Sequence, residues 1–510
     1  MNKKLVKLLA VSLASVSAVS LASCSIGGGG GGGVADDPST LEIMAWNAGG
    51  TTEELNRIVK AFEDANPDID VDLTASSAVE SSKVYLDPDN NTVDLFMSPF
   101  ETSMAYTKYL EPLDSVLEME VDGVKISQKL DMGIINTMKS EEGKLYTLPY
   151  SSSINGIVYN ATVFEEKGYA LPQTTNDLVK LTTQIVSDFP GKDDPKPYIY
   201  YAEYWKYLTD AWMAQLAGTE VYANWYKGVW TNEDGTTEAN SIKIFKENEY
   251  KRASYEVLQQ LVGGQKNVFT GTNTLTHTFS QTYFMNGKAL MTPNGSWLEG
   301  EMRNTSSKIT PKLMKTPVIS ALGTKLGLSE AQLKAVISYV DGTATDSQKT
   351  YAEGLDEAIV EKVRTARNIY YSEQTQYATF IPEYSTAKDA AKRFIAFYYS
   401  DAALLIKEEY GGLLPAVYSD GAKRKLSSEQ ASAFTKSCLD LDANAIYIGK
   451  MLSGKLLYNG GLINLYYSEP ARAFTYGNDA KTVKQYFDAE NSYWDGAWAN
   501  ILIDADITQE

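Results

Sequence analysis

The apolar positions after residue 40 alternate between runs typical of buried strands and spacings typical of amphipathic helices. Thr40–Trp46 runs apolar and predicts a first strand, and Ile69–Ala75 predicts a second strand with alternating acids. Between them, Leu55, Ile58 and Phe62 fall at helical spacing and predict a helix with one apolar face. A strand, a helix and a strand at this spacing predict a right-handed crossover in a parallel sheet.

Further along the chain, the same alternation continues. Val93–Ser98 predicts a third strand, and Gly143–Tyr150 with Gly156–Asn160 predicts a strand pair around a serine-rich link. Ser329–Tyr339 and Thr350–Tyr371 predict two helices. The pattern as a whole predicts an α/β fold.

The first residues have the layout of a secretory signal. Lysines precede an apolar run from Leu8 to Leu21, and small residues lead into Cys24 and the glycine run Gly27–Gly33. The run is short for a membrane span, which takes about 20 apolar residues. The small residues before Cys24 resemble the lipobox of bacterial lipoproteins, in which the cysteine becomes the lipidated first residue. The alternative is an ordinary signal peptide with an incidental cysteine. We therefore expect a signal peptide over 1–23, and a lipidated Cys24 with a flexible linker over 24–39, outside the cytoplasmic membrane.

Composition limits the partners and the chemistry. A formal net charge of −19 argues against nucleic acid and anionic lipid surfaces, and is compatible with neutral or cationic ligands. The chain has two cysteines, Cys24 and Cys438, and one histidine, His277. Nucleophilic catalysis through histidine and a zinc site of two or three histidines are therefore improbable. The acidic turn at Asp87 lacks the glycine and glutamate of a calcium loop. We expect no metal or cofactor.

Four stretches together resemble the extracellular solute-binding proteins of ABC importers, and most closely the sugar-binding group that is similar to maltose-binding protein. They occur in that family's order and are Gly143–Thr174, Phe284–Trp297, Ile381–Phe397 and Gly411–Ala416.

The resemblance implies two α/β lobes of the type II periplasmic-binding-protein-like fold, joined by crossing strands with the ligand cleft between them. We expect lobe 1 to comprise 40–150 and 292–379, and lobe 2 to comprise 151–291 and 380–510. The segment 322–377 departs from the family pattern and is expected as a helical insertion in lobe 1, either for packing or to cover one end of the cleft. Hinges are expected near 150–153, 292–294 and 380–382.

Aromatic and polar residues at strand ends are the candidate ligand contacts. Ligands of open α/β sheets collect outside the carboxyl ends of strands, and sugars pair aromatic faces with amide and carboxylate hydrogen bonds. Six candidates meet these criteria: Trp46, Asn47, Glu101, Ser296, Trp297 and Tyr467. Each has a simpler interpretation as core edge, turn or cap. Tyr201, Tyr204, Trp205 and Trp212 recur at helical spacing and predict a buried stripe instead.

The function that the resemblance implies is binding without chemistry. The protein is expected to be a monomer that captures a carbohydrate, such as an oligosaccharide, by lobe closure and delivers it to the membrane permease of an ABC transporter. Three alternatives remain open. A surface glycosidase needs two carboxylates and no histidine. A binding protein for a polyamine or another non-sugar solute would suit the negative charge. A purely structural lipoprotein would bind no small solute.

Overall fold

The computed structural model describes most of the chain after residue 39. The described residues are 40–46, 52–76, 91–99, 108–130, 132–140, 142–151, 153–246, 248–372, 377–410, 431–449, 456 and 465–507. The expected signal peptide, Cys24 and the glycine linker lie outside them, as do Asn47 and Glu101. Two sheets with separate hydrophobic cores divide the described part, and we call the two bodies lobe 1 and lobe 2.

Lobe 1 is built on a five-stranded sheet of order β2-β1-β3-β14-β6. The strands are β1 (Thr40–Trp46), β2 (Asp70–Ser76), β3 (Leu95–Pro99), β6 (Leu148–Pro149) and β14 (Tyr377–Phe380). Strand β1 pairs in parallel with β2 and β3, which confirms the predicted parallel sheet. Strand β14 is antiparallel to both β3 and β6.

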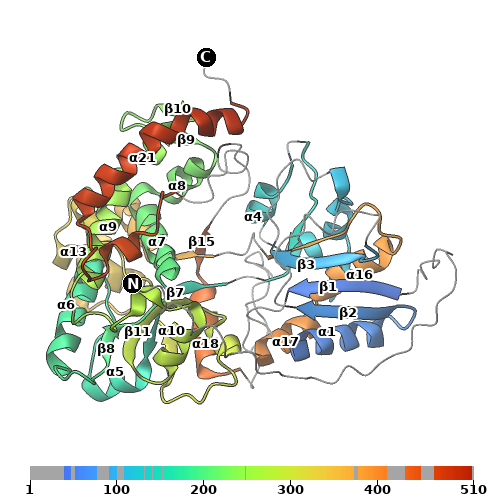
Figure 1. The fold of residues 1–510 in the computed structure, drawn as a ribbon, viewed down its shortest axis with the longest axis horizontal. Coiled ribbons are helices and arrows are strands. Elements are labelled where there is room, and N and C mark those ends of the chain that lie inside the picture. The colour runs from blue at the N-terminus through green and yellow to red at the C-terminus, as the bar shows by residue number, and fades with distance from the viewer. Residues whose placement is uncertain are drawn as a thin grey trace, which may run out of the picture. The chain divides into compact units, whose positions relative to one another are not determined.

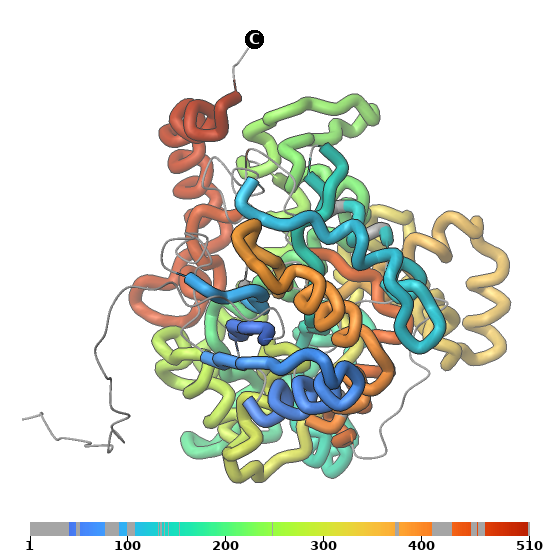
Figure 2. The backbone as a smooth tube through the Cα atoms, turned by 90° about the vertical axis from the view of Figure 1, so that its right-hand side faces the viewer, coloured from blue at the N-terminus to red at the C-terminus, as the bar shows by residue number. Residues whose placement is uncertain are grey.

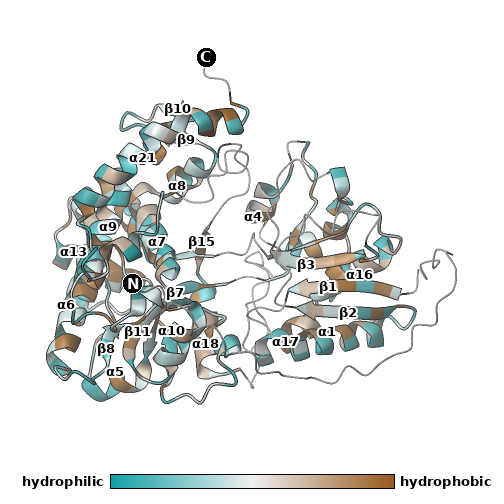
Figure 3. Cartoon of the chain, in the orientation of Figure 1, coloured by the Kyte–Doolittle hydropathy of each residue, from teal (hydrophilic) through white to brown (hydrophobic). Residues whose placement is uncertain are grey.

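Strand side chains alternate between the two faces of the lobe 1 sheet, so both faces carry apolar residues that must be covered. Helix α1 (Thr52–Ala65) buries Ile58 and Phe62 against one face, and the Phe62 ring meets Phe394 of α16 at 5.1 Å. The other face holds Phe96, whose ring stacks on Phe380 at 5.0 Å. Figure 1 shows α1 beside α17 under this sheet, and Figure 3 shows brown apolar and teal polar turns along α1. The helices of lobe 1 are α1, α2 (Asp114–Leu117), α3 (Ile126–Lys129), α4 (Met132–Thr137), α16 (Lys388–Tyr398) and α17 (Asp401–Tyr410), with the hairpin β4 (Glu120–Val121) and β5 (Val124–Lys125).

Lobe 2 is built on a sheet of order β15-β13-β7-β11-β8, with β12 also paired to β7. The strands are β7 (Asn155–Asn160), β8 (Lys196–Tyr198), β11 (Ala289–Gly295), β12 (Pro311–Leu313), β13 (Ile369–Tyr371) and β15 (Ile446–Ile448). Every residue of β7 and of β11 is buried, because helices cover both faces of the sheet.

Many helices surround this second sheet. Those before β11 are α5 (Ala161–Lys167), α6 (Thr175–Asp188), η3 (Ala202–Trp205), α7 (Lys206–Ala217), α8 (Thr219–Tyr226), η4 (Ile242–Ile244), α9 (Glu249–Val262), η5 (Thr272–Thr274) and α10 (His277–Met285), with the hairpin β9 (Val229–Thr231) and β10 (Thr237–Ala239). Those after it are α11 (Leu298–Glu301), α12 (Ala321–Lys325), α13 (Glu330–Val340), α14 (Asp346–Glu353), α15 (Glu357–Arg367), α18 (Ala433–Asp442), α20 (Pro470–Phe474) and α21 (Val483–Asp504). No helix in the described ranges has the length and apolarity that crossing a bilayer requires.

The expected division of the chain between lobes differs from the observed strand pairing. Strand β11 and the residues up to 372 belong to lobe 2, whereas 377–410 belongs to lobe 1. The chain therefore passes between the lobes after β6 and again between β13 and β14, and part of each passage lies outside the described residues. The described residues beside the two passages are joined by hydrogen bonds, since the Tyr150 amide donates to Tyr377 O at 3.0 Å and the Ser153 amide to Ser372 Oγ at 3.4 Å. The other expected hinges, 292–294 and 380–382, lie within β11 and at the end of β14.

The sequence predicted two helices in 322–377, but the segment holds most of α12, then α13, α14 and α15, and the strand β13. Capping boxes at Ser329 and Thr345 start α13 and α14, and the Asp356 carboxylate caps α15. Leu333 and Val363 are buried in the core that also contains Trp212 of α7. The insertion thus packs onto lobe 2, not lobe 1, and Figure 2 shows it in yellow to orange at one edge of the molecule.

Candidate functional site

An aromatic cluster surrounds Trp297, one of the residues predicted from the sequence. The indole lies 5.7 Å from the ring of Tyr204 and 5.8 Å from that of Tyr207, and the Tyr207 ring lies 5.4 Å from Tyr371. Tyr204 lies on η3 and Tyr207 at the start of α7. Trp297 is the second residue after β11, and Tyr371 is the last residue of β13. We call Tyr204, Tyr207, Trp297 and Tyr371 the Trp297 cluster.

The backbone at Gly295 makes this arrangement possible. A Cβ at that position would lie 2.2 Å from Cζ3 of Trp297, so the indole occupies the space that a side chain would need. The next residue, Ser296, is buried, and its hydroxyl accepts from the Ile154 amide at 3.4 Å. Strand β11 therefore ends in a fixed geometry that directs the indole toward α7. Trp297 itself is 4% exposed.

Five residues near strand ends, two of them on β7 and β11 of lobe 2, have buried polar side-chain atoms without a hydrogen-bond partner. Among the described residues, nothing pairs with Oδ1 or Nδ2 of Asn155, Nδ2 of Asn294, or the hydroxyls of Ser98, Tyr150 and Ser151. All five residues lie at or next to a strand end, and Asn155 pairs with Gly295 and Tyr371 across the sheet. Because a buried polar group without a partner costs about 1–3 kcal/mol, such a concentration marks a place where a ligand could supply the partners.

Ionisable groups adjoin the same cluster. Lys206 Nζ lies 5.4 Å from the ring centre of Tyr207 and 5.8 Å from that of Tyr371. Burial raises the pKa of Asp210, whose carboxylate accepts from the Tyr222 hydroxyl at 2.9 Å, to about 7. Burial, together with the nearby Glu203 carboxylate, raises the pKa of Glu469 to about 8. Burial next to the aromatic rings therefore favours the neutral form of these two carboxyl groups more strongly than water does.

Lobe 1 carries an aromatic group of its own at the end of β1. The indole of Trp46, which is half-buried, stacks on the ring of Tyr377 at 5.2 Å with an interplanar angle of 12°. Tyr377 in turn meets Tyr150 edge-on at 6.3 Å. Trp46 thus lies beside the crossing, as a strand-end position implies.

Tyr467 packs against the same hydrophobic core as the Trp297 cluster. Its ring contacts Tyr486 at 5.2 Å and Tyr493 at 5.5 Å, both on α21. The structure therefore places Ser296 beside Trp297 by sequence adjacency, and Tyr467 before α20, against that core and against two rings of α21.

The sequence predicted neither Tyr204, Tyr207 and Tyr371 of the Trp297 cluster nor Asn155 beside it as ligand contacts. Tyr204 was assigned to a buried helical stripe, and the helical spacing gave no sign that Tyr371 would join it from a strand far along the chain. Asn155 carries no sequence signal, since a lone asparagine before a glycine is typical of a turn.

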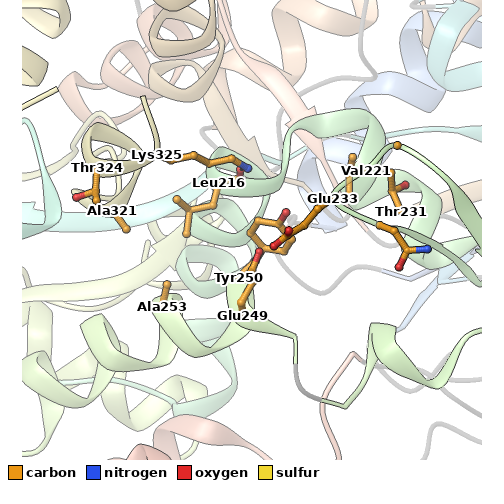
Figure 4. Close-up of a pocket in the computed structure, with 12 residues that line it drawn as sticks. Leu216, Val221, Thr231, Glu233, Glu249, Tyr250, Ala253, Ala321, Thr324 and Lys325 are labelled. Carbon is orange, nitrogen blue, oxygen red and sulfur yellow. The ribbon is translucent and has the colours of Figure 1, made fainter. Parts of the chain in front are cut away.

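A groove of about 770 Å³ lies elsewhere on lobe 2, between α7, α8, the β9–β10 hairpin, α9 and α12 (Figure 4). None of its 12 lining residues was predicted from the sequence. Tyr250 stands in its wall, but Lys325 Nζ lies 4.9 Å from the centre of this ring, and Trp225 and Trp230 pack against it at 5.8 Å and 6.4 Å. We place the candidate ligand site at the Trp297 cluster, because the unpaired Asn155 amide lies beside it, whereas none of the groove's lining residues has a buried polar side-chain atom without a partner in the described part of the chain.

In the described part of the chain, no three His, Cys, Asp or Glu side chains gather as metal ligands. The chemistry that the cluster offers is aromatic contact and hydrogen bonding. Two α/β lobes joined by crossings, with aromatic residues and unsatisfied amides beside them, define a two-lobed solute-binding protein of the type II fold.

The chain belongs to the bacterial extracellular solute-binding protein family, whose model matches residues 48–404. It is 26% identical over 261 residues to the multiple sugar-binding protein of Streptococcus mutans, covering 48% of this chain and 54% of that protein. It is 25% identical over 144 residues to the melibiose/raffinose/stachyose-binding protein MelE of Bacillus subtilis, covering 28% and 32%. The chain thus spans about half or less of these relatives.

Among solved structures, maltose-bound MalE3 of T. maritima aligns with a TM-score of 0.56 at 15% identity, covering 90% of this chain and 99% of that one. This likeness shows the fold, and it is the two-lobed type II fold expected from the sequence.

Proposed function

We propose that the protein is the substrate-binding component of an ABC importer that captures an extracellular carbohydrate. The observation that carries the proposal is the Trp297 cluster with the unsatisfied Asn155 amide beside it. An aromatic face covers the C–H face of a sugar ring, while amide and carboxyl groups bond its hydroxyls. The partial relatives that are named as sugar-binding proteins support the same ligand class.

Binding would work through lobe closure. A ligand that contacts both lobes favours the arrangement in which those contacts are made, and shifts the population toward it. The described residues beside the two passages between the lobes are hydrogen-bonded to each other, Tyr150 to Tyr377 and Ser153 to Ser372, which supports a hinge at this place. The closed protein would then deliver its ligand to a membrane permease encoded by another chain.

We further propose that Cys24 anchors the protein, as a monomer, to the outer face of the membrane. The support is the sequence of small residues before Cys24 and the glycine run after it. Two or more acyl chains would give stable anchoring. Mass spectrometry of the mature N-terminus tests this: a diacylated Cys24 supports the anchor, and an unmodified N-terminus after cleavage elsewhere contradicts it.

A thermal-shift screen of the purified chain tests the ligand class. Maltose, melibiose, raffinose and stachyose are compared with spermidine and a tripeptide. A ligand at 100 times its Kd adds about 2.7 kcal/mol to the free energy of unfolding, which raises the Tm measurably. We expect a shift with a saccharide, and recovery of that saccharide intact by chromatography. A shift with spermidine alone would contradict the sugar assignment, and a cleaved saccharide would indicate a glycosidase.

A further inference from the structure

Asn155 is the first residue of β7 and follows the crossing from lobe 1 directly. Its side chain is 1% exposed, and across the sheet it lies opposite Gly295 on one side and Tyr371 on the other. Neither Oδ1 nor Nδ2 has a hydrogen-bond partner among the described residues. The whole carboxamide is therefore buried and unpaired.

Such an amide contrasts with a buried asparagine that has a structural role. Asn248 is also fully buried, but its Nδ2 donates to Ile244 O at 3.1 Å. Its Oδ1 accepts from the amides of Tyr250 and Lys251 at 3.0 Å and 3.1 Å, which caps α9. A carboxamide offers two donors and one acceptor oxygen, and leaving them unpaired in the interior is destabilising. Unlike Asn248, Asn155 makes no hydrogen bond that would stabilise the fold, so the stability of the fold does not explain why its carboxamide is buried.

The Asn155 amide and the Trp297 indole meet at Gly295. A Cβ on Gly295 would lie 2.5 Å from Asn155 Oδ1 and 2.2 Å from Trp297 Cζ3. The two side chains therefore press on the same backbone position, and the amide lies at the edge of the indole. A ligand group that stacks on the Trp297 indole, or displaces it, would therefore come within reach of the Asn155 carboxamide.

We propose that Asn155 is a specificity-determining ligand residue, whose carboxamide bonds two adjacent hydroxyls of a saccharide once the Trp297 indole shifts. Nδ2 donates to the oxygen of one hydroxyl while Oδ1 accepts the proton of its neighbour, so the amide selects for a vicinal diol. A polyammonium ligand offers only donors and would leave Nδ2 unpaired. The inference rests on the proposed carbohydrate function and adds to it the residue and the hydroxyl pattern it recognises.

The first test uses stability and needs no ligand. Asn155→Leu keeps the approximate shape and removes the unpaired polar atoms, so the Tm is expected to stay equal or rise. Asn248→Leu is the matched control, and it removes three hydrogen bonds, so its Tm is expected to fall by several degrees. A fall for Asn155→Leu comparable to that of Asn248→Leu would show a structural amide and overturn the proposal.

The second test is calorimetric titration with raffinose and with maltose. We expect Asn155→Leu to weaken the better-bound probe at least tenfold and Asn248→Leu to change its Kd less than twofold. Asn155→Ala, which adds no bulk, should show the same loss. A deoxy analogue of the probe that lacks one hydroxyl of the bonded pair should bind the wild type weakly, with little further loss in Asn155→Leu.

The outcomes separate this inference from the proposed function. If the wild type binds a saccharide and both Asn155 variants bind it equally well, the carbohydrate function stands and the role of Asn155 is refuted. If the wild type releases no heat with any saccharide but responds to spermidine, both the function and the inference are refuted.

Discussion

Gly295 allows a sharp test of how the binding site is built, because its substitution adds a single methyl group that no ligand would touch. In Gly295→Ala, the new Cβ would stand 2.2 Å from Trp297 Cζ3 and 2.5 Å from Asn155 Oδ1. The Asn155 amide can turn away about its side-chain torsions, but the indole is a rigid ring, so the indole must leave its position or strand β11 must shift. Overpacking of this kind costs about 1–3 kcal/mol.

A neighbouring glycine provides the matched control. Gly156 pairs with Asn294 on the same two strands, and a Cβ there would meet its nearest atom, Leu313 Cδ1, at 3.5 Å. This is ordinary van der Waals contact, so Gly156→Ala fits. It should be neutral or stabilise by about 0.4–1 kcal/mol, because alanine loses less backbone entropy on folding.

The assay combines calorimetric unfolding with saccharide titration and tryptophan emission. At about 2–4 °C per kcal/mol, Gly295→Ala should lower the Tm by roughly 2–12 °C, and Gly156→Ala should not lower it. Gly295→Ala should also weaken saccharide binding at least tenfold and shift the emission of the displaced indole toward the red. Equal Tm and Kd values for the two variants would refute the reasoning that Gly295 positions Trp297 and Asn155.

Three further predictions concern other parts of the molecule. Lys407→Met should lower the free energy of unfolding of lobe 1 by about 3–5 kcal/mol in calorimetry. The reason is that Lys407 Nζ lies 3.0 Å from Glu54 Oε1, and the substitution leaves this carboxylate buried without its cation. Arg57→Ala is the control: it breaks an exposed ion pair with Glu409 between the same two helices and should cost under about 1 kcal/mol. Burial raises the pKa of Glu469 to about 8, so between about pH 4.5 and pH 8 the folded state holds a proton that the unfolded state has released. The Tm should therefore fall as the pH rises through this range. Glu469→Gln, which cannot ionise, should flatten the fall. Tyr250→Ala in the groove should leave the saccharide Kd unchanged by titration, and a tenfold loss would move the site there.

Local patterns in the sequence predicted local structure well. The order β1, α1, β2 follows from apolar spacing within 40 residues, and α1 buries the predicted Leu55, Ile58 and Phe62. The expected division between the lobes failed for 292–295 of β11 and for 380–410, because the sheet that a strand joins depends on hydrogen bonds to distant strands. Strand β11 pairs with β7 of lobe 2, and β14 inserts between β3 and β6 of lobe 1.

The candidate site shows the same limit. Trp297 could be found because it follows a recognisable strand-end pattern. Its neighbours could not, because helical spacing places Tyr204 on a buried stripe but does not show that Tyr207 and Tyr371 pack against each other beside Trp297. Asn155 becomes informative only when its missing hydrogen-bond partners are known, and no sequence pattern carries that information.

Titration of the best-bound saccharide into the wild type and Trp297→Leu tests the central claim most directly. Leucine keeps apolar bulk in the cluster but offers no aromatic face, so circular dichroism should confirm the fold while the Kd rises at least tenfold. The account predicts one saccharide bound per wild-type chain with this loss in the variant. Equal affinity in both proteins, or no heat from any saccharide with the wild type, would contradict it.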